Sequence, residues 1–115
     1  MPVRPAIFTT TELGSGAAAL RIAGDMTSAC ELPLMTEHDR LTDAGATRLI
    51  LDFGALDYMN SGGIGLLVTL LVRAQRRGQT VAAVGLTTHY RQIFQLTRLD
   101  EAIGLYDDLE TALKV

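Results

Sequence analysis

A run of six residues, 48–53, constrains this fold more than any other part of the chain. It reads Arg-Leu-Ile-Leu-Asp-Phe and is nearly continuous in apolar side chains. A strand with one solvated face would instead alternate apolar and polar residues. A continuous run of this length is typical of a strand that is covered on both faces, as in parallel sheets. We therefore expect a buried strand over residues 48–53.

A small polar turn follows this strand and leads into a strongly apolar segment. The turn reads Asp-Tyr-Met-Asn-Ser-Gly-Gly over residues 57–63, and the apolar segment covers residues 64–74. The length and residue choice of that segment predict a helix, which we place over residues 61–77. Ser61 then lies at the N-terminus of this helix, where unpaired backbone N–H groups favour negative charge. Such a position suits the addition or removal of a phosphate.

The apolar side chains of this helix do not fall on one side. Ile64, Leu67, Val68 and Leu71 form a stripe at helical spacing, whereas Leu66 and Leu70 lie on a different face. Two interpretations of Leu66 and Leu70 stay open. They form either a thick core under a neighbouring helix or an exposed apolar patch for a partner or a homodimer.

Strands and helices alternate along the rest of the chain. We expect a hairpin of strands over residues 6–11 and 17–23, turning at Gly14-Ser15-Gly16, and further strands over residues 80–84 and 103–106. Helices are expected from Glu31 to about residue 43, over residues 89–96 and over residues 107–113. Ser28 and Glu31 have the spacing of a capping box before the first of these helices. This order predicts an α/β fold whose mixed, mostly parallel sheet opens with a hairpin.

Composition limits the class of protein. The 115 residues are 48% hydrophobic, carry a net charge of -3 and include a single cysteine. We expect one domain over residues 1–115 in a reducing cytoplasm, without an internal disulfide. The negative charge offers no general attraction to nucleic acid or to a membrane surface. The first residues show no signal-peptide pattern, and no apolar run approaches the roughly 20 residues that span a bilayer.

The motifs that would indicate an enzyme are missing from the sequence. Gly62, Gly63 and Gly65 fit neither a phosphate-binding loop nor a dinucleotide fingerprint. Met59 stands where a nucleophile elbow requires glycine. Cys30 and His38 have no partners at metal-ligand spacing, so we interpret them as a small buried group and a surface or boundary side chain. We therefore expect no enzyme, no cofactor and no metal.

The turn Asn60-Ser61-Gly62-Gly63-Ile64-Gly65 resembles the STAS domain family, specifically the bacterial anti-sigma factor antagonists (anti-anti-sigma factors). The motif of that family reads Asp-Ser-Ser/Thr-Gly-Leu-Gly after a strand that ends like Leu51-Asp52-Phe53. Gly24-Asp25-Met26-Thr27 resembles a second segment of the family, and residues 89–99 resemble its third helix. Asn60 replaces the usual Asp, and Gly62 replaces the second Ser or Thr. The resemblance implies a STAS-like domain with about four helices packed mainly on one face of the sheet.

The resemblance also implies a mechanism of partner switching. The unmodified protein would bind an anti-sigma factor that is also a serine kinase, and a sigma factor would be released. Phosphorylation of Ser61 would break that complex, and a serine phosphatase would restore it. The residues that this implies at the partner contact are Asp25, Met26, Thr27, Met59, Asn60, Ser61, Gly62, Gly63, Ile64 and Leu66.

Other interpretations of the same residues stay open. Ser61 could be a helix N-cap without a regulatory role, since serine is among the preferred capping residues. The glycines 62, 63 and 65 could allow close packing of the helix on the strand, which we favour, or the approach of a partner backbone. The chain as a whole could be a STAS signalling scaffold, or a module that binds a nucleotide or another small ligand without a phosphoswitch.

Overall fold

The sheet of this protein has five strands whose order in space follows their order in the chain. The computed structural model describes residues 4–114. The strands are β1 (Ile7–Gly14), β2 (Ala17–Met26), β3 (Arg48–Met59), β4 (Thr80–Val84) and β5 (Ile103–Tyr106). The first two strands pair antiparallel, and each later strand pairs parallel with the one before it. The expected hairpin and the mostly parallel sheet are therefore confirmed.

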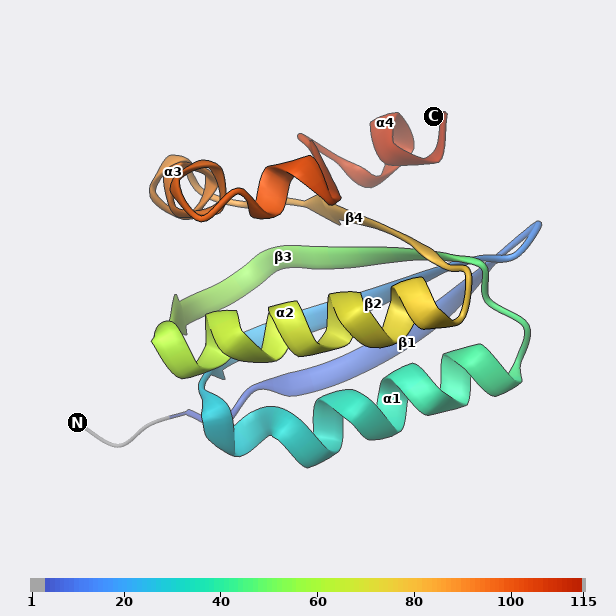
Figure 1. Cartoon of the computed structure of the whole chain (residues 1–115), viewed down its shortest axis with the longest axis horizontal. Coiled ribbons are helices and arrows are strands. Elements are labelled where there is room, and N and C mark those ends of the chain that lie inside the picture. The colour runs from blue at the N-terminus through green and yellow to red at the C-terminus, as the bar shows by residue number, and fades with distance from the viewer. Residues whose placement is uncertain (1–3, 115) are drawn as a thin grey trace.

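Four helices connect or follow the parallel strands. They are α1 (Glu31–Asp43), α2 (Ser61–Arg76), α3 (Thr88–Leu96) and α4 (Leu109–Leu113), with 3-10 turns η1 (Ser28–Cys30) and η2 (Leu99–Glu101). Helices α1 and α2 pack into the same core against the sheet, and Figure 1 shows that both begin at the same end of it. No helix in the described part of the chain is long and apolar enough to cross a membrane.

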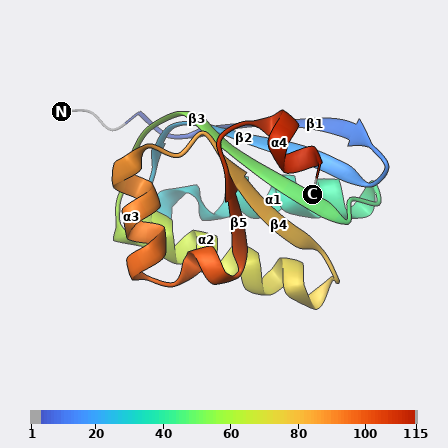
Figure 2. The ribbon, with the colours of Figure 1, turned by 90° about the horizontal axis from the view of Figure 1, so that it is seen from above.

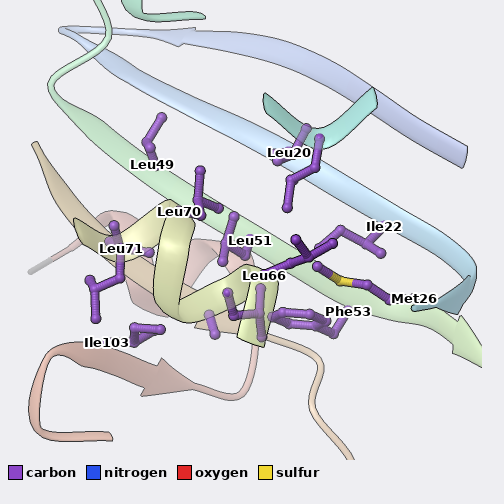
Figure 3. Packing of buried hydrophobic residues seen from close by; sticks show 14 of the residues in the cluster. Leu20, Ile22, Met26, Leu49, Leu51, Phe53, Leu66, Leu70, Leu71 and Ile103 are labelled. Carbon is purple, nitrogen blue, oxygen red and sulfur yellow. The ribbon is translucent and has the colours of Figure 1, made fainter. Parts of the chain in front are cut away.

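The main core lies between the sheet and the helices α1, α2 and α3. It joins alternate residues of the central strands, such as Leu49, Leu51 and Phe53 of β3, to side chains of these three helices. Figure 3 shows Leu66, Leu70 and Leu71 of α2 among them. On the other face of the sheet, a smaller cluster joins Ile50 to α4, which Figure 2 shows in front of the strands. The strand over residues 48–53 is thus covered on both faces, as its apolar run predicts.

The patch interpretation of Leu66 and Leu70 is wrong. Their side chains are 7% and 1% exposed and belong to the main core. The exposed apolar side chains of α2 are instead Val68 and Val72, at 42% and 40%. The sequence spacing shows which residues share a side of the helix, but the arrangement of β3, β4 and α3 decides which sides are covered.

Strand β3 is longer than expected. It continues six residues beyond Phe53, so residues 57–59 belong to the strand and not to a turn. Asp57 and Gly54 are poor strand formers, but β2 extends alongside and pairs Asp25 with Tyr58 and Met26 with Met59. Pairing with a neighbouring strand here overrides local propensity. Only Asn60 separates the strand from helix α2.

Two local expectations about helix α1 are also wrong. Ser28 does not form a capping box with Glu31; it lies in η1, whose cap is Thr27, and α1 begins after Cys30 without a side-chain cap. His38 is not at the surface. It is 2% exposed, and its Nε2 lies 2.7 Å from Oε1 of Gln79. The burial of Cys30, which is 4% exposed, is confirmed.

Candidate functional site

The candidate site is what we call the Ser61 turn, residues 59–63: the last residue of β3, the linking Asn60 and the first three residues of α2. It forms where β2 and β3 end together, with Met26 paired to Met59. The chain turns into η1 after β2 and into α2 after β3, so two helical segments begin next to each other. Figure 1 shows this end of the sheet with the starts of α1 and α2. Carboxyl ends of parallel strands are where α/β folds commonly place their binding residues.

Asn60 holds the turn in place through three hydrogen bonds. Its side-chain Oδ1 accepts from the N–H of Gly63 at 2.9 Å, which makes Asn60 the N-cap of α2. Its backbone C=O accepts from the N–H of Ile64 at 3.0 Å, and its own N–H donates to the C=O of Met26 at 3.3 Å. The turn is therefore fixed to both the helix and the end of β2.

Ser61 is the first residue of α2 and is exposed to solvent. Because Asn60 caps the helix, the interpretation of Ser61 as the N-cap is wrong. The N–H groups of Ser61 and Gly62 precede the first intrahelical bond, so neither has an acceptor within the helix. The first turn of α2 contains no acidic residue. An anion on the Ser61 side chain would therefore meet free N–H donors and the positive end of the helix dipole.

The three glycines of this segment have three different environments. A Cβ on Gly63 would lie 2.2 Å from the carbonyl oxygen of Met26, so only glycine fits there. A Cβ on Gly62 would lie 3.0 Å from Cβ of Ser28, which makes Gly62 a close contact of η1. A Cβ on Gly65 would meet no atom within 4 Å. Close packing on the strand therefore explains Gly63 alone, and Gly65 leaves an open place on the surface.

The residues predicted at the partner contact gather at this end of the sheet, but they differ in exposure. Ser61 is exposed, and five of the others are half-buried: Asp25, Thr27, Asn60, Gly62 and Ile64. Met26, Met59, Gly63 and Leu66 are buried and support the site from beneath. The carboxylate of Asp25 is already engaged, since it accepts a hydrogen bond from the N–H of Arg4 at 3.1 Å.

Sequence reasoning missed part of the surface around Ser61. Ser61, Gly65, Val68 and Val72 are all exposed, and their spacing of four, three and four residues places them along one side of α2. We call these four residues the outer stripe of α2. The interval from Ser61 to Gly65 could have shown the first step of this stripe. The exposure of Val68 and Val72 could not be predicted before the core was known.

The site offers no grouping of side chains for a metal. No group of three or more His, Cys, Asp or Glu residues that could hold an ion exists within residues 4–114. Hollows of about 270 and 220 Å³ lie elsewhere, the first lined by Gly14, Gly16 and Gly45 and the second by Arg48, Thr80 and Tyr106. Neither includes a residue of the Ser61 turn, and both are below the size of about 300 Å³ at which ligand pockets begin.

The fold and the site together define a small α/β domain that presents a serine at a helix start. The family model described as "Mlab, STAS domain" matches residues 9–109, and the chain belongs to the STAS domain family.

Solved structures with the same fold include anti-sigma factor antagonists. The antagonist from Mycobacterium paratuberculosis has a TM-score of 0.75 and 21% identity, covering 94% of this chain and 92% of its own. The anti-sigma factor antagonist SpoIIAA in its unphosphorylated form has a TM-score of 0.73 and 16% identity, covering 93% and 94%. The phosphorylated form of SpoIIAA, from Bacillus, also has a TM-score of 0.73 and 16% identity, covering 94% and 97%. At these identities the likeness shows the fold.

Proposed function

We propose that this protein is an anti-sigma factor antagonist whose partner binding is switched by phosphorylation of Ser61. The unmodified form binds an anti-sigma factor that is also a serine kinase, and this releases a sigma factor. Phosphorylation of Ser61 ends the complex, and a serine phosphatase restores it. The domain acts by binding and needs no cofactor or metal of its own.

One observation carries this proposal: Ser61 is exposed at the first position of α2, and Asn60 performs the capping. The cap supplied by Asn60 contributes about 1 kcal/mol and does not involve Ser61. The Ser61 hydroxyl makes no capping hydrogen bond. A kinase could reach this hydroxyl, and modification would leave the cap intact.

The energetics favour a switch of contacts over a switch of fold. A phosphate adds about -1.5 to -2 charge units at neutral pH. At the start of α2 an anionic group is favourable by about 0.3–1 kcal/mol. The same charge against a partner's surface costs several kcal/mol through repulsion and desolvation.

The outer stripe of α2 supplies a contact surface next to the serine. Val68 and Val72 expose apolar area, and the missing side chain of Gly65 allows close approach between them and Ser61. A partner that covers this stripe would place its surface directly over the Ser61 hydroxyl. A phosphate there would separate the two surfaces.

The test is a comparison of binding and melting for Ser61→Asp and Ser61→Glu. We expect an anti-sigma kinase to copurify with the wild-type protein from its own cells and to be lost from either variant, while the thermal melt of each variant stays almost unchanged. Ser15→Asp is the matched control, because Ser15 is an exposed serine in the β1–β2 hairpin, at the opposite end of β2 from the Ser61 turn. It should bind like wild type.

Two results would contradict the proposal. If Ser61→Asp binds the kinase as tightly as Ser15→Asp does, the charge lies outside the contact and the scaffold interpretation is favoured. If Ser61→Asp unfolds the protein, the side chain lies at a position where an added charge destabilises the fold. Genes for a histidine-kinase-like ATPase or a serine phosphatase beside the gene for this chain would independently favour the phosphoswitch.

A further inference from the structure

The end of β3 that leads into the Ser61 turn has a strand on one side only. β2 pairs with β3 as far as Met59, whereas β4 pairs only with residues 48–52 of β3. Helix α3 takes the place that β4 leaves, and Figure 2 shows it at this end of the sheet. The ring of Phe94 in α3 packs edge-on against Phe53 of β3, with ring centroids 6.1 Å apart.

A second contact joins α3 directly to the Ser61 turn. The N–H of Met59 donates a hydrogen bond to the hydroxyl oxygen of Tyr90 at 2.8 Å. Met59 is 4% exposed and Tyr90 is 9% exposed, so water has little access to this amide. A buried N–H needs an acceptor, and β4 does not extend far enough to supply one. The Tyr90 hydroxyl therefore replaces the carbonyl of a missing strand.

The next amide along the chain is held from a different element. The N–H of Asn60 donates to the C=O of Met26 in β2. Consecutive amides of an extended chain point to opposite sides, so α3 and β2 hold the two residues before Ser61 from two directions. Asn60 then carries the cap that sets the direction of the first turn of α2.

We propose that Tyr90 is a positioning residue for Ser61: its hydroxyl fixes the Met59 amide and thereby the backbone from which the serine is presented to the kinase. This inference rests on the proposed function, since it concerns the same serine. It adds that α3, which does not contain the serine, controls how well the serine is presented. The ring of Tyr90 belongs to the core, whereas its hydroxyl serves the turn.

Amide hydrogen exchange measured on the variant Tyr90→Phe tests whether the Tyr90 hydroxyl fixes the backbone of the Ser61 turn. This variant keeps the ring in the core, and the contact of Phe94 with Phe53 keeps α3 in place. We expect exchange of the Met59 and Asn60 amides to rise about tenfold or more, with protection of β4 and α1 unchanged. Tyr58→Phe is the matched control, because it removes a hydroxyl from the neighbouring residue, whose side chain is 51% exposed. It should leave these amides unchanged.

Two exchange results would overturn the proposal. Unchanged protection of Met59 and Asn60 in Tyr90→Phe would show that the hydroxyl does not hold the turn. Protection lost evenly across α3, β3 and β4 would show that Tyr90 serves the core alone.

The share of Ser61 that carries phosphate provides the functional readout. It can be measured by mass spectrometry on each variant purified from the protein's own cells. We expect this share to fall in Tyr90→Phe and to stay at the wild-type level in Tyr58→Phe. A faster exchange without a fall in phosphate would overturn the role of Tyr90 in presentation. Wild-type protein without phosphate would count against the proposed function, and exchange would still decide whether Tyr90 holds the turn.

Discussion

At the scale of single residues, the Ser61 turn depends on two positions that perform different tasks. Asn60 supplies the cap, and Gly63 supplies the space in which α2 begins directly on the end of β2. Ser61 lies between them and has neither task. This division of roles leaves the serine free to be modified without loss of the local structure.

Comparing the variants Gly63→Ala and Gly65→Ala separates the effect of close packing on stability from the effect of helix propensity. Alanine favours a helix over glycine by up to about 1 kcal/mol at either position. At Gly63 the added Cβ would overlap the Met26 carbonyl oxygen, and backbone cannot rotate away, so we expect a net loss of about 2–3 kcal/mol. At Gly65 nothing opposes the methyl group, so we expect a gain of about 0.5–1 kcal/mol. Urea denaturation of both variants measures this difference. Equal stabilities would mean that α2 does not begin against Met26.

Asn60→Asp tests the departure from the family motif. Aspartate caps a helix as well as asparagine does, and its charge lies favourably at the helix start, so the fold should be intact and more stable by about 0.3–1 kcal/mol. The added charge lies beside the acceptor serine, where it could orient a kinase's metal–nucleotide. We expect the rate of phosphorylation to change more than partner affinity does. Kinetics with the purified kinase decide this, and unchanged phosphorylation with a large loss of binding would make Asn60 a contact residue.

At the scale of elements, a buried polar pair joins helix α1 to the segment before β4. Gln79 is 5% exposed, and its Nε2 donates to Oγ1 of Thr42 at 3.0 Å and to the C=O of Ala46 at 2.9 Å. Its Oε1 must therefore accept from His38, whose Nε2 carries the proton. The Nδ1 of His38 has no partner within the described residues. A single amide side chain thus bonds two side chains of α1 and a carbonyl of the loop that follows it.

Gln79→Ala should remove all three hydrogen bonds at once and leave buried polar groups without partners. We expect a loss of about 2–3 kcal/mol in the free energy of unfolding. Gln75→Ala, at an exposed position of α2, should change stability by less than about 0.5 kcal/mol. Urea midpoints of the two variants make the comparison. Similar small effects would show that the His38–Gln79 contact contributes little.

The stability of helix α4 should depend on pH, because its N-cap is the carboxylate of Asp108. The N–H of Thr111 donates to Oδ1 of Asp108 at 2.8 Å, and this backbone hydrogen bond, followed by the side-chain hydrogen bond of Thr111, lowers the pKa of Asp108. Because the folded pKa is below the unfolded value of about 3.9, the stabilisation is complete above that pH and is lost as the pH falls through the folded pKa. Amide signals of α4 should therefore show fraying in acid. Asp108→Asn keeps an acceptor and should remove the pH dependence; fraying at the same pH in that variant would assign the effect to another group.

At the scale of the whole molecule, pattern and alternation were enough to predict the sheet and its helices. The continuous run over residues 48–53 predicts a doubly covered strand, and the structure places α2 and α4 on its two faces. The start of α2 at Ser61 is also confirmed.

What the sequence could not show depends on contacts between distant residues. The extension of β3 needs β2 beside it, and the burial of His38 needs Gln79, 41 residues further along. Asn60 and Ser61 are neighbours, and asparagine and serine are equally good N-cap residues, so the sequence does not show which of them caps the helix. The hydrogen bond between Met59 and Tyr90 joins residues that are 31 positions apart, and no local sequence pattern indicates it.

The central claim is that the exposed, non-capping Ser61 is the phosphoacceptor of this domain. The most direct test is phosphosite mapping by mass spectrometry on the protein purified from its own cells, with Ser61→Ala as the comparison. We predict one phosphate, located on Ser61, and none in Ser61→Ala. A phosphate on Ser28 or Thr69 with Ser61 unmodified would contradict the claim.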